Sequence, residues 1–408
     1  MPTQGADAMR SAPCAMRGDR GHMREDLLDR IDAGRLQQLT LELTRIRSYT
    51  GDTREVAEAY ARHLERIGLE TQVLRDFPND PCVVARLRGA GGGPTLEFNG
   101  HLDTVPVEHP APLVTDGRVF GRGAADMKGG LAAMAEAARV IAESGSRLKG
   151  DLLLVAHGLH EAPDGHGEDL LDLVRRGIRG DAVIITEVAS DTLPVVGLGQ
   201  AIFDFTISRP GETTHELLTP PATPHPILAA VRLVSIMQDR NAELGRSPIP
   251  LVGAESFFIG MLHGGDFFNR WTNTCRLVGT RRYGPENSLA AVEQELRAMA
   301  AQVEQDTWAR VDLQLTPVRD GFCVAEDEPL VLTLRRAYTK VTGQELPLVG
   351  TRMVGDAAIF IREGKVPALY HGPGGQGAHA DLESVAISEL VRAAKVYVLT
   401  ALDYVGEA

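Results

Sequence analysis

The chain has 408 residues, of which 43% are hydrophobic and 24% charged, a balance typical of a folded globular protein and not of a disordered or fibrous one. Its length predicts roughly two domains. It carries 42 lysines and arginines against 55 aspartates and glutamates, a net charge of −13, and we find no basic run. We therefore expect no nucleic-acid partner.

The four cysteines lie far apart and form no Cys-x-x-Cys pair, which argues against a zinc knuckle or a disulfide framework and favours a reducing, cytoplasmic location. Residues 1–24 lack an apolar core segment, and no later apolar run reaches membrane-spanning length. We expect neither a secretory signal nor membrane association. Because three further methionines lie within residues 1–24, we interpret that segment as a disordered or misassigned tail.

Helical and strand patterns alternate between residues 25 and 197. Apolar residues recur at helical spacing over 55–68, and an alanine-rich helix is expected over 126–144, beginning at Asp126. Short apolar runs, each ended by polar or glycine-rich sequence, predict buried strands over 82–87, 95–100, 151–158 and 182–187. These elements together predict an α/β layer with a mostly parallel sheet.

The pattern changes between residues 198 and 316. Strands are expected over 201–209, 256–262, 274–283 and 311–318, and helices over 225–244 and 288–309. This β-α-β-β-α-β order predicts a small α+β domain with an antiparallel sheet. The α/β pattern resumes over 317–408 and includes a final helix from about Ser384, so residues 198–316 are expected to be a domain inserted into the larger one.

Histidines and acids follow the predicted strands, at the edge where parallel α/β sheets place their sites. The candidates are His101, Asp126, Glu161, Glu187 and His379. Each one alone is more often a solvated surface residue. As a group, imidazoles and carboxylates without thiolates predict a site for zinc, cobalt or manganese.

Asp103 lies two residues after His101 in an extended segment, so both side chains are expected to point the same way. Asp103 can then accept a hydrogen bond from the His101 ring nitrogen that faces away from a metal. It would orient the ligand without binding the ion. The alternative, a local turn or capping aspartate, would account for this residue alone.

Six segments carry a resemblance to a known family: "GHLDTVP", "GRGAADMKGG", "HEAPDGHG", "IITEV", "GETTH" and "GPGGQGAHADLE". In this order and spacing they resemble the M20 metallopeptidase and amidohydrolase family, which includes acetylornithine deacetylase, succinyl-diaminopimelate desuccinylase and glutamate carboxypeptidase. The similarity extends over nearly all of the chain from about Arg24.

The resemblance implies two divalent metal ions, zinc or else cobalt or manganese. His101 and Glu187 would hold one ion, Glu161 and His379 the other, and Asp126 would bridge them. Two ions bridged in this way can acidify a shared water for attack on an amide. The implied substrate is an N-acyl amino acid, a small peptide or a related amide with a carboxylate.

The inserted domain would then be a lid and dimerisation domain. His215 matches a lid histidine that, in dimeric members, reaches the partner's active site and polarises the scissile carbonyl, which implies a homodimer; otherwise it is a surface turn residue. Arg282 matches a lid-strand arginine that binds the substrate carboxylate in several members, or is a solvated strand residue. Arg352 is expected to add a cation, and Asp356 and Gly374 fall on substrate-side loops.

His160 departs from the family pattern. The family places two adjacent glutamates here, a general base followed by a metal ligand; Glu161 fills the ligand position and His160 the base position. His160 could accept a proton from water in a hydrolase. It could instead donate a hydrogen bond or bind metal in a non-hydrolytic step such as amide formation, acyl transfer or a lyase reaction. A non-catalytic binding protein is the third reading. The complete ligand set argues against this third reading, and we place hydrolysis ahead of a non-hydrolytic reaction.

Overall fold

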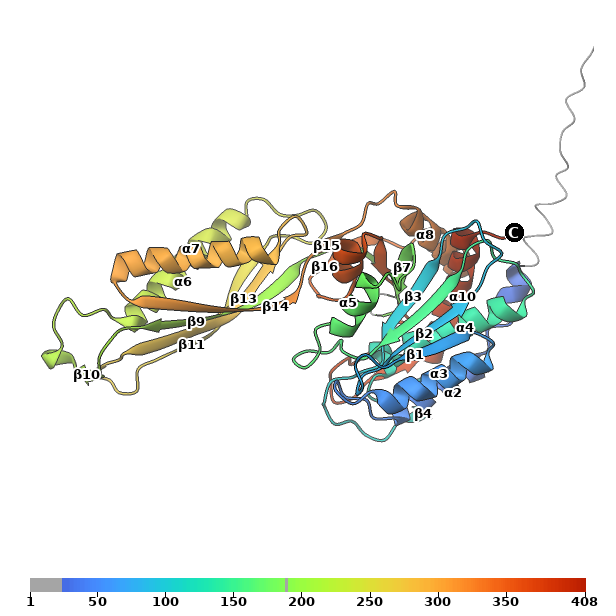
Figure 1. Cartoon of the computed structure of the whole chain (residues 1–408), viewed down its shortest axis with the longest axis horizontal. Coiled ribbons are helices and arrows are strands. Elements are labelled where there is room, and N and C mark those ends of the chain that lie inside the picture. Colours follow the sequence, from blue (N-terminus) through green and yellow to red (C-terminus); the bar gives the residue numbers. More distant parts are fainter. Residues whose placement is uncertain (1–23, 188–189) are drawn as a thin grey trace, which may run out of the picture.

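The computed structural model describes residues 24–187 and 190–408 and consists of an α/β body and an elongated α+β domain (Figure 1). The expected disordered tail lies outside the described residues except for Arg24, which donates hydrogen bonds to Asp403 and to Glu407, the latter at 2.8 Å. Among the described helices, none combines the length and the apolar character that crossing a bilayer requires.

The body is built on a sheet with the strand order β1-β2-β6-β3-β7-β17. Its strands are β1 (Glu70–Leu74), β2 (Cys82–Leu87), β3 (Leu96–His101), β6 (Leu152–His157), β7 (Ala182–Ile185) and β17 (Ala368–Tyr370). Pairing is antiparallel from β1 to β6 and parallel from β6 to β17. The expected mostly parallel α/β sheet is confirmed.

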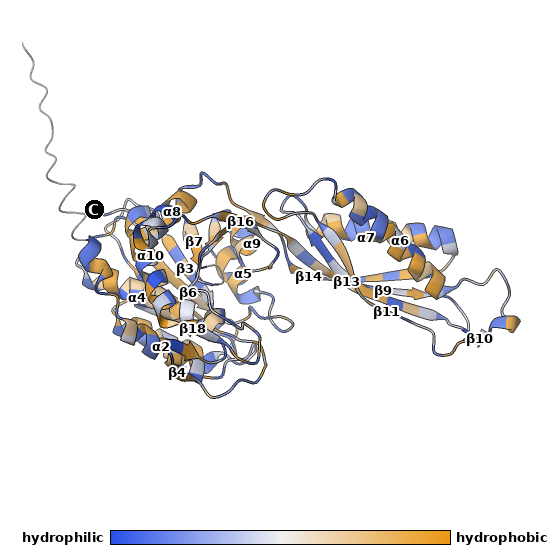
Figure 2. Cartoon of the chain, turned by 180° about the vertical axis from the view of Figure 1, so that it is seen from behind, coloured by the Kyte–Doolittle hydropathy of each residue, from blue (hydrophilic) through white to orange (hydrophobic). Residues whose placement is uncertain are grey.

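Helices cover both faces of this sheet, which is why its central strands are apolar (Figure 2). The main core joins the sheet to α2 (Ala33–Arg45), α3 (Arg54–Arg66), α4 (Gly129–Glu143), α8 (Pro329–Thr342) and α10 (Ile387–Val405). A smaller core on β7 and β17 involves α5 (Glu168–Arg175), α9 (Ala357–Ile359) and η3 (Phe360–Gly364).

Two helix starts differ from the sequence expectation. The alanine-rich helix α4 begins at Gly129 and not at Asp126, which lies in the preceding segment η1 (Ala124–Lys128) with the non-helical angles φ −126° and ψ 89°. The carboxylate of Asp126 faces His101 and His379 and does not cap the helix. The final helix likewise begins at Ile387, because Ser384–Ala386 forms strand β18.

The second domain has an antiparallel sheet in the order β11-β13-β9-β14. Its strands are β9 (Gly199–Ser208), β11 (Ser256–Gly264), β13 (Thr274–Tyr283) and β14 (Arg310–Arg319), and its helices are α6 (Pro226–Leu244) and α7 (Leu289–Thr307). Strand β9 alternates buried and more exposed residues, and its buried side chains share a separate core with the two helices. The predicted β-α-β-β-α-β order is confirmed.

Short strands that the sequence patterns did not indicate complete the fold. One small sheet joins β15 (Phe322–Cys323), β8 (Leu193–Gly197) and β16 (Leu348–Thr351), and another joins β18, β5 (Arg118–Phe120) and β4 (Leu113–Thr115). At the end of the second domain farthest from the body, β10 (Thr214–His215) pairs with β12 (Arg270–Trp271) and leads into η2 (Glu216–Leu218) (Figure 1).

Candidate metal centre

Three adjacent parallel strands bring most of the expected ligands to one edge of the sheet. His101 is the last residue of β3, Glu161 follows β6, and Glu187 follows β7. The register places His101 directly opposite His157, the last residue of β6. The fourth residue, His379, lies after β17 in a loop where its backbone has the left-handed φ of 62°.

The five expected ligands converge, and Asp126 lies between two groups of them. Its Oδ1 is 3.1 Å from Nε2 of His101, which is also 3.5 Å from Oε2 of Glu187. Its Oδ2 is 3.3 Å from Nε2 of His379, which is also 3.0 Å from Oε1 of Glu161. One carboxylate thus presents a separate oxygen to each group.

These separations fit bound divalent ions. Ligand atoms around one tetrahedral zinc ion lie about 3.3 Å apart. Nδ1 of His101 is 3.0 Å from the backbone carbonyl oxygen of Asp103 and donates to it, so in the neutral ring Nε2 presents a lone pair. That lone pair faces oxygens of Asp126 and Glu187. Acceptors that face one another in this way need a cation or a proton between them.

The electrostatics also favour bound cations. Burial lowers the pKa of His101, but Asp103, Asp126 and Glu187 outweigh it and raise the pKa well above its usual value. The hydrogen bond with Asp126 raises the pKa of His379 to about 9. Such shifts indicate an excess of negative charge, which a divalent ion would neutralise in place of protons.

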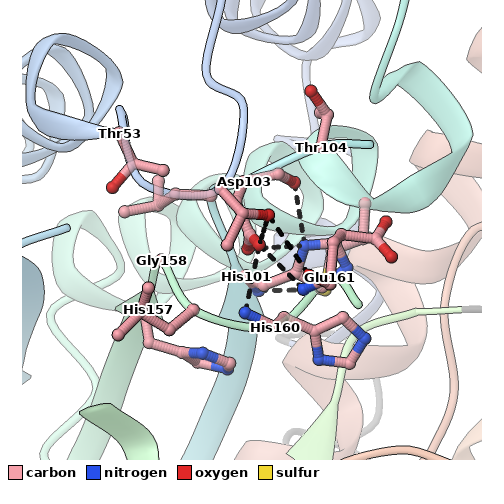
Figure 3. A network of polar contacts seen from close by, with 12 residues as sticks. Thr53, His101, Asp103, Thr104, His157, Gly158, His160 and Glu161 are labelled. Carbon is pink, nitrogen blue, oxygen red and sulfur yellow. Dashed lines mark hydrogen bonds and ion pairs between the residues drawn. The ribbon is translucent and has the colours of Figure 1, made fainter. Parts of the chain in front are cut away.

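Asp103 lies next to the candidate ligands and contacts His101, His160 and Glu161 (Figure 3). Nδ1 of His101 lies 3.0 Å from the backbone oxygen of Asp103 and 3.3 Å from the carboxylate Oδ1 of Asp103. The expected hydrogen bond between Asp103 and this nitrogen is therefore made partly by the main chain. The other carboxylate oxygen accepts the backbone N–H of His160 at 3.0 Å and that of Glu161 at 2.8 Å. It also accepts the hydroxyl of Thr50 at 2.8 Å. Asp103 therefore links the β3 and β6 sides of the centre.

His160 lies at the edge of the ligand group. Its ring stacks on that of His101, with centroids 4.1 Å apart and planes 5° apart, and its Nδ1 is 2.7 Å from Oδ2 of Asp356. His101, His160 and Glu187 each offer one ligand atom, all within 4.8 Å of one another. Stacked rings, however, lie in nearly parallel planes, so their in-plane lone pairs do not meet at one atom. The geometry therefore favours His160 beside an ion over His160 as a ligand.

The chain does not bring His215 to this centre. His215 lies on β10, at the far tip of the second domain (Figure 1). Its ring accepts the backbone N–H of Leu217 at 3.2 Å, and its other nitrogen is 3.1 Å from the side-chain nitrogen of Asn269.

The two expected substrate arginines lie next to each other. Arg282 donates to the backbone oxygen of Arg352 at 2.8 Å, and Arg352 donates to the backbone oxygen of Ala254 at 2.8 Å. Burial, followed by the charge of Arg352, lowers the pKa of Arg282. Among the described residues neither guanidinium pairs with a carboxylate, so the two groups together can bind an anion.

A small hollow adjoins the centre on the side of Glu187. It is lined by Glu187, Pro194, Thr351, Met353, Val354 and Tyr370. The loop that contains Gly374, with its φ of 65°, lies close to Glu187: a Cβ atom on Gly372 would lie 2.5 Å from the carbonyl carbon of Glu187. Because Gly372 has no side chain, the loop can pack directly on the backbone of Glu187.

Sequence reasoning missed three buried residues that hold the centre in place. Glu383 accepts backbone N–H groups around Asp126, and Asp356, expected on a substrate-side loop, is buried behind His160 and bound to Arg319. Glu383 is the last residue of the segment "GPGGQGAHADLE", and its place in that segment was the only feature of the sequence that indicated a functional role. The contacts of Asp356 and Arg319 have no sequence signal because they join distant segments.

Comparison with curated proteins finds relatives along most of the chain. An N-formyl-4-amino-5-aminomethyl-2-methylpyrimidine deformylase from Halalkalibacterium halodurans is 26% identical over 424 residues, covering 94% of this chain and 97% of the relative. A succinyl-diaminopimelate desuccinylase from Paracoccus denitrificans is 28% identical over 380 residues, covering 88% of this chain and 96% of the relative.

Solved structures share the fold. An aminopeptidase PepT from Bacillus cereus is 21% identical with a TM-score of 0.77, covering 92% of this chain and 99% of that one. A dinuclear metal-binding peptidase of the M20 family from Bacillus subtilis is 16% identical with a TM-score of 0.66, covering 91% of this chain and 97% of that one. The family described as Peptidase family M20/M25/M40 matches residues 98–403. The chain therefore belongs to the M20 peptidase family of metal-dependent hydrolases that act on amide bonds.

Proposed function

We propose that this protein uses two divalent ions, zinc or else cobalt or manganese, to hydrolyse the amide bond of an N-acyl amino acid or small peptide. The observation that supports this most directly is the carboxylate of Asp126, which presents one oxygen to each group of candidate ligands. A pair of ions held there would supply an acidified water and polarise the scissile carbonyl.

In this proposal His160 takes the proton of the attacking water. Its neutral imidazole has a suitable basicity, and it lies beside the ligands, stacked on His101. Two ions nearby would disfavour the protonated ring, which keeps His160 neutral before the step but also lowers its basicity. His101 and Asp126 would serve as ligands and take no part in proton transfer.

A second function is favoured by the protonation of His160. Burial lowers its pKa, but Asp356 outweighs this effect and raises it to about 9. A charged His160 would donate a hydrogen bond and accept none, as in a non-hydrolytic step such as amide formation, acyl transfer or a lyase reaction. A binding protein without turnover is the third candidate.

Arg282 and Arg352 are proposed to hold the substrate carboxylate, and the loop of Gly374 to line the substrate side. The relatives named as a deformylase and a desuccinylase support an N-acyl substrate. The hollow beside Glu187 is small, which supports a short group next to the ions.

We further propose a homodimer formed through the second domain as a lid. Strand β11 lies at the edge of its sheet, and Phe258, Met261 and Leu262 on it are exposed. An exposed apolar edge strand favours pairing with another chain. In such a dimer His215, remote from the centre of its own chain, would reach the partner's centre and stabilise the oxyanion.

The test is a hydrolysis screen of N-formyl, N-acetyl and N-succinyl amino acids and dipeptides with added zinc, cobalt or manganese. It compares the native protein with His160→Ala and His160→Glu. Activity in the native protein that His160→Ala lowers by ~100-fold or more supports His160 as the base. Hydrolysis that appears only in His160→Glu would favour the second function, and native activity that His160→Ala leaves unchanged would contradict the role of His160.

A further inference from the structure

Asp356 is the closest charged partner of the His160 ring. Its Oδ2 is 2.7 Å from Nδ1 of His160, and the same oxygen is 3.3 Å from Nε2 of the buried His157. Asp356 is 1% exposed, so it does not serve as a solvated surface acid. A carboxylate this deeply buried needs partners for both oxygens.

Arg319 provides the partner for the second oxygen. Its Nη2 and Nε lie 3.2 and 3.3 Å from Oδ1 of Asp356, and its side chain is also buried. Arg319 is the last residue of β14, the strand through which the second domain returns to the body (Figure 1). Space for the guanidinium depends on Gly167, where an added Cβ atom would lie 2.8 Å from Nη2 of Arg319.

This arrangement determines which nitrogen of His160 can accept a proton. Asp356 has no proton to donate while it pairs with Arg319, so Nδ1 of His160 must be the donor in their contact. In the neutral ring the proton then sits on Nδ1, and Nε2 carries the lone pair. Within residues 24–187 and 190–408, Nε2 of His160 has no hydrogen-bond partner in the structure.

We propose that Asp356 is a positioning residue for His160, held by Arg319, and that it keeps the ring in the tautomer whose Nε2 accepts the proton of water. This inference rests on the proposed hydrolytic function. In the step, the water proton moves to Nε2 while the Nδ1 proton stays between His160 and Asp356. A carboxylate–imidazole pair supplies here what a single glutamate would supply as a base.

A competing arrangement makes different predictions. If His160 bound an ion through Nε2, Asp356 would orient a metal ligand, and replacing either residue would weaken metal binding by ~10-fold or more. The stacking of His160 on His101 disfavours this arrangement, because the two rings do not converge on one point. Metal affinity therefore separates the two roles.

The first test needs no activity and uses the full-length protein with added zinc. Thermal unfolding is measured for Asp356→Asn, His160→Gln and the double variant. We expect the double variant to lose less than the sum of the single losses in Tm, by about 2 °C or more, because the two side chains interact. Glu255→Gln, which breaks a buried pair with Arg281 in the second domain, is the control and should be additive with His160→Gln.

A change of background makes this test sharper. Asp356→Asn weakens the pair with Arg319 in either background, but in a His160→Glu background it also relieves two facing carboxylates, so it should lower Tm by less than it does in the native background. Additivity in the cycle, together with a Tm loss of equal size in both backgrounds, would overturn the proposal even if the protein proves to be an active hydrolase.

The second test uses a substrate found by the hydrolysis screen. Asp356→Asn should lower kcat by ~100-fold or more, with KM within about threefold and metal affinity unchanged. A ~10-fold or greater loss of metal affinity in both Asp356→Asn and His160→Gln would overturn the proposal in favour of His160 as a ligand. If no substrate is found, the hydrolytic function fails, while the unfolding cycle still decides whether Asp356 and His160 are coupled.

Discussion

Glu383 holds the backbone that carries Asp126 without facing the candidate ligands itself. One of its oxygens accepts the N–H groups of Ala125 and Asp126 at 2.9 and 3.0 Å, and the other accepts that of Gly123 at 3.1 Å. The second oxygen also pairs with the buried Arg122 at 2.8 Å. A single buried carboxylate therefore fixes the main chain at the proposed bridging residue.

Glu383→Gln should cost about 3 kcal/mol or more of unfolding free energy, because it leaves the charge of Arg122 buried and unpaired. Denaturant unfolding measures this loss. The control is Asp172→Asn, which removes an exposed partner of Arg176 and should cost less than about 1 kcal/mol. Equal losses in the two variants would contradict the role given to Glu383.

His371 is a buried histidine outside the group of candidate ligands. Neither of its ring nitrogens has a hydrogen-bond partner among the described residues, and the rings of Tyr338 and Tyr397 lie nearly perpendicular to it. Burial lowers its pKa to about 3. The unfolded chain, with a histidine pKa near 6.5, binds more protons between these two pH values, so this histidine lowers stability as the pH falls from about 6.5 toward 3.

Glu97 has the opposite linkage, because burial raises its pKa to about 7 and its contribution to stability is lost as the pH rises from about 4.5 through 7. A comparison of variants isolates the effect of His371 from that of Glu97. Relative to the native protein, His371→Leu should weaken the acid-side loss of stability by up to about 1.4 kcal/mol per pH unit. Unfolding curves at pH 4 to 7 provide the measurement, and a constant offset between the two proteins would refute the assignment.

At the scale of elements, the start of helix α4 packs against the segment that follows β7. Gly130 makes this approach possible, because a Cβ atom there would overlap the backbone oxygen of Thr186, the residue before Glu187. The helix and the strand both have to move if this contact is lost. The position of Glu187 therefore depends on a residue that has no side chain.

Gly130→Ala should lower stability by about 2 kcal/mol or more and weaken metal binding, because it displaces the segment that carries Glu187. Gly245→Ala is the control, since Gly245 ends α6 with an ordinary φ of −62° and should change stability by less than about 1 kcal/mol. Denaturant unfolding and metal titration measure both effects. Unchanged metal affinity in Gly130→Ala would contradict the proposed coupling.

The sequence predicted elements best where an apolar run ends sharply. Strands β2 and β13 have the expected bounds, because polar or glycine residues follow their apolar runs. The start of α4 was misplaced because the Asp126 carboxylate faces His101 and His379, both from other segments, and its backbone is not helical. Local propensity contains no information about such a contact.

The candidate ligands were predictable for a topological reason. Parallel strands end at the same edge, so residues at or just after the ends of β3, β6 and β7 come together. The contact between His160 and Asp356 joins residues 196 positions apart, and no pattern in either segment indicates it. The location of His215 could not be predicted either, because its position in the sequence does not reveal that it lies far from the candidate metal centre of its own chain.

At the scale of the whole molecule, the second domain extends away from the body (Figure 2). Leu217 and Leu218 beside His215 are 82% and 80% exposed, and Phe268 nearby is 88% exposed. Side chains of this kind are seldom left in water without a partner. The elongated shape agrees with the proposal that a second copy covers this domain.

The native protein should have the mass of a dimer in solution, and the double variant Met261→Lys/Leu262→Lys should be a monomer, because charges on an edge strand oppose its pairing. Size-exclusion chromatography with light scattering measures the mass. Leu332→Lys, on α8 of the body, is the control and should remain dimeric. A native monomer would remove the proposed role of His215 in a partner's centre.

The central claim is that the carboxylate of Asp126 bridges two divalent ions. Counting the bound metal ions tests this claim most directly. After incubation with zinc, cobalt or manganese and removal of excess ion, elemental analysis of the native protein should find about two ions per chain. Asp126→Asn, which has one carbonyl oxygen and no charge, should lose at least one of them, while the exposed Asp116→Asn should keep both. A native protein that retains no divalent ion, or an Asp126→Asn variant that retains two with unchanged affinity, would contradict the account.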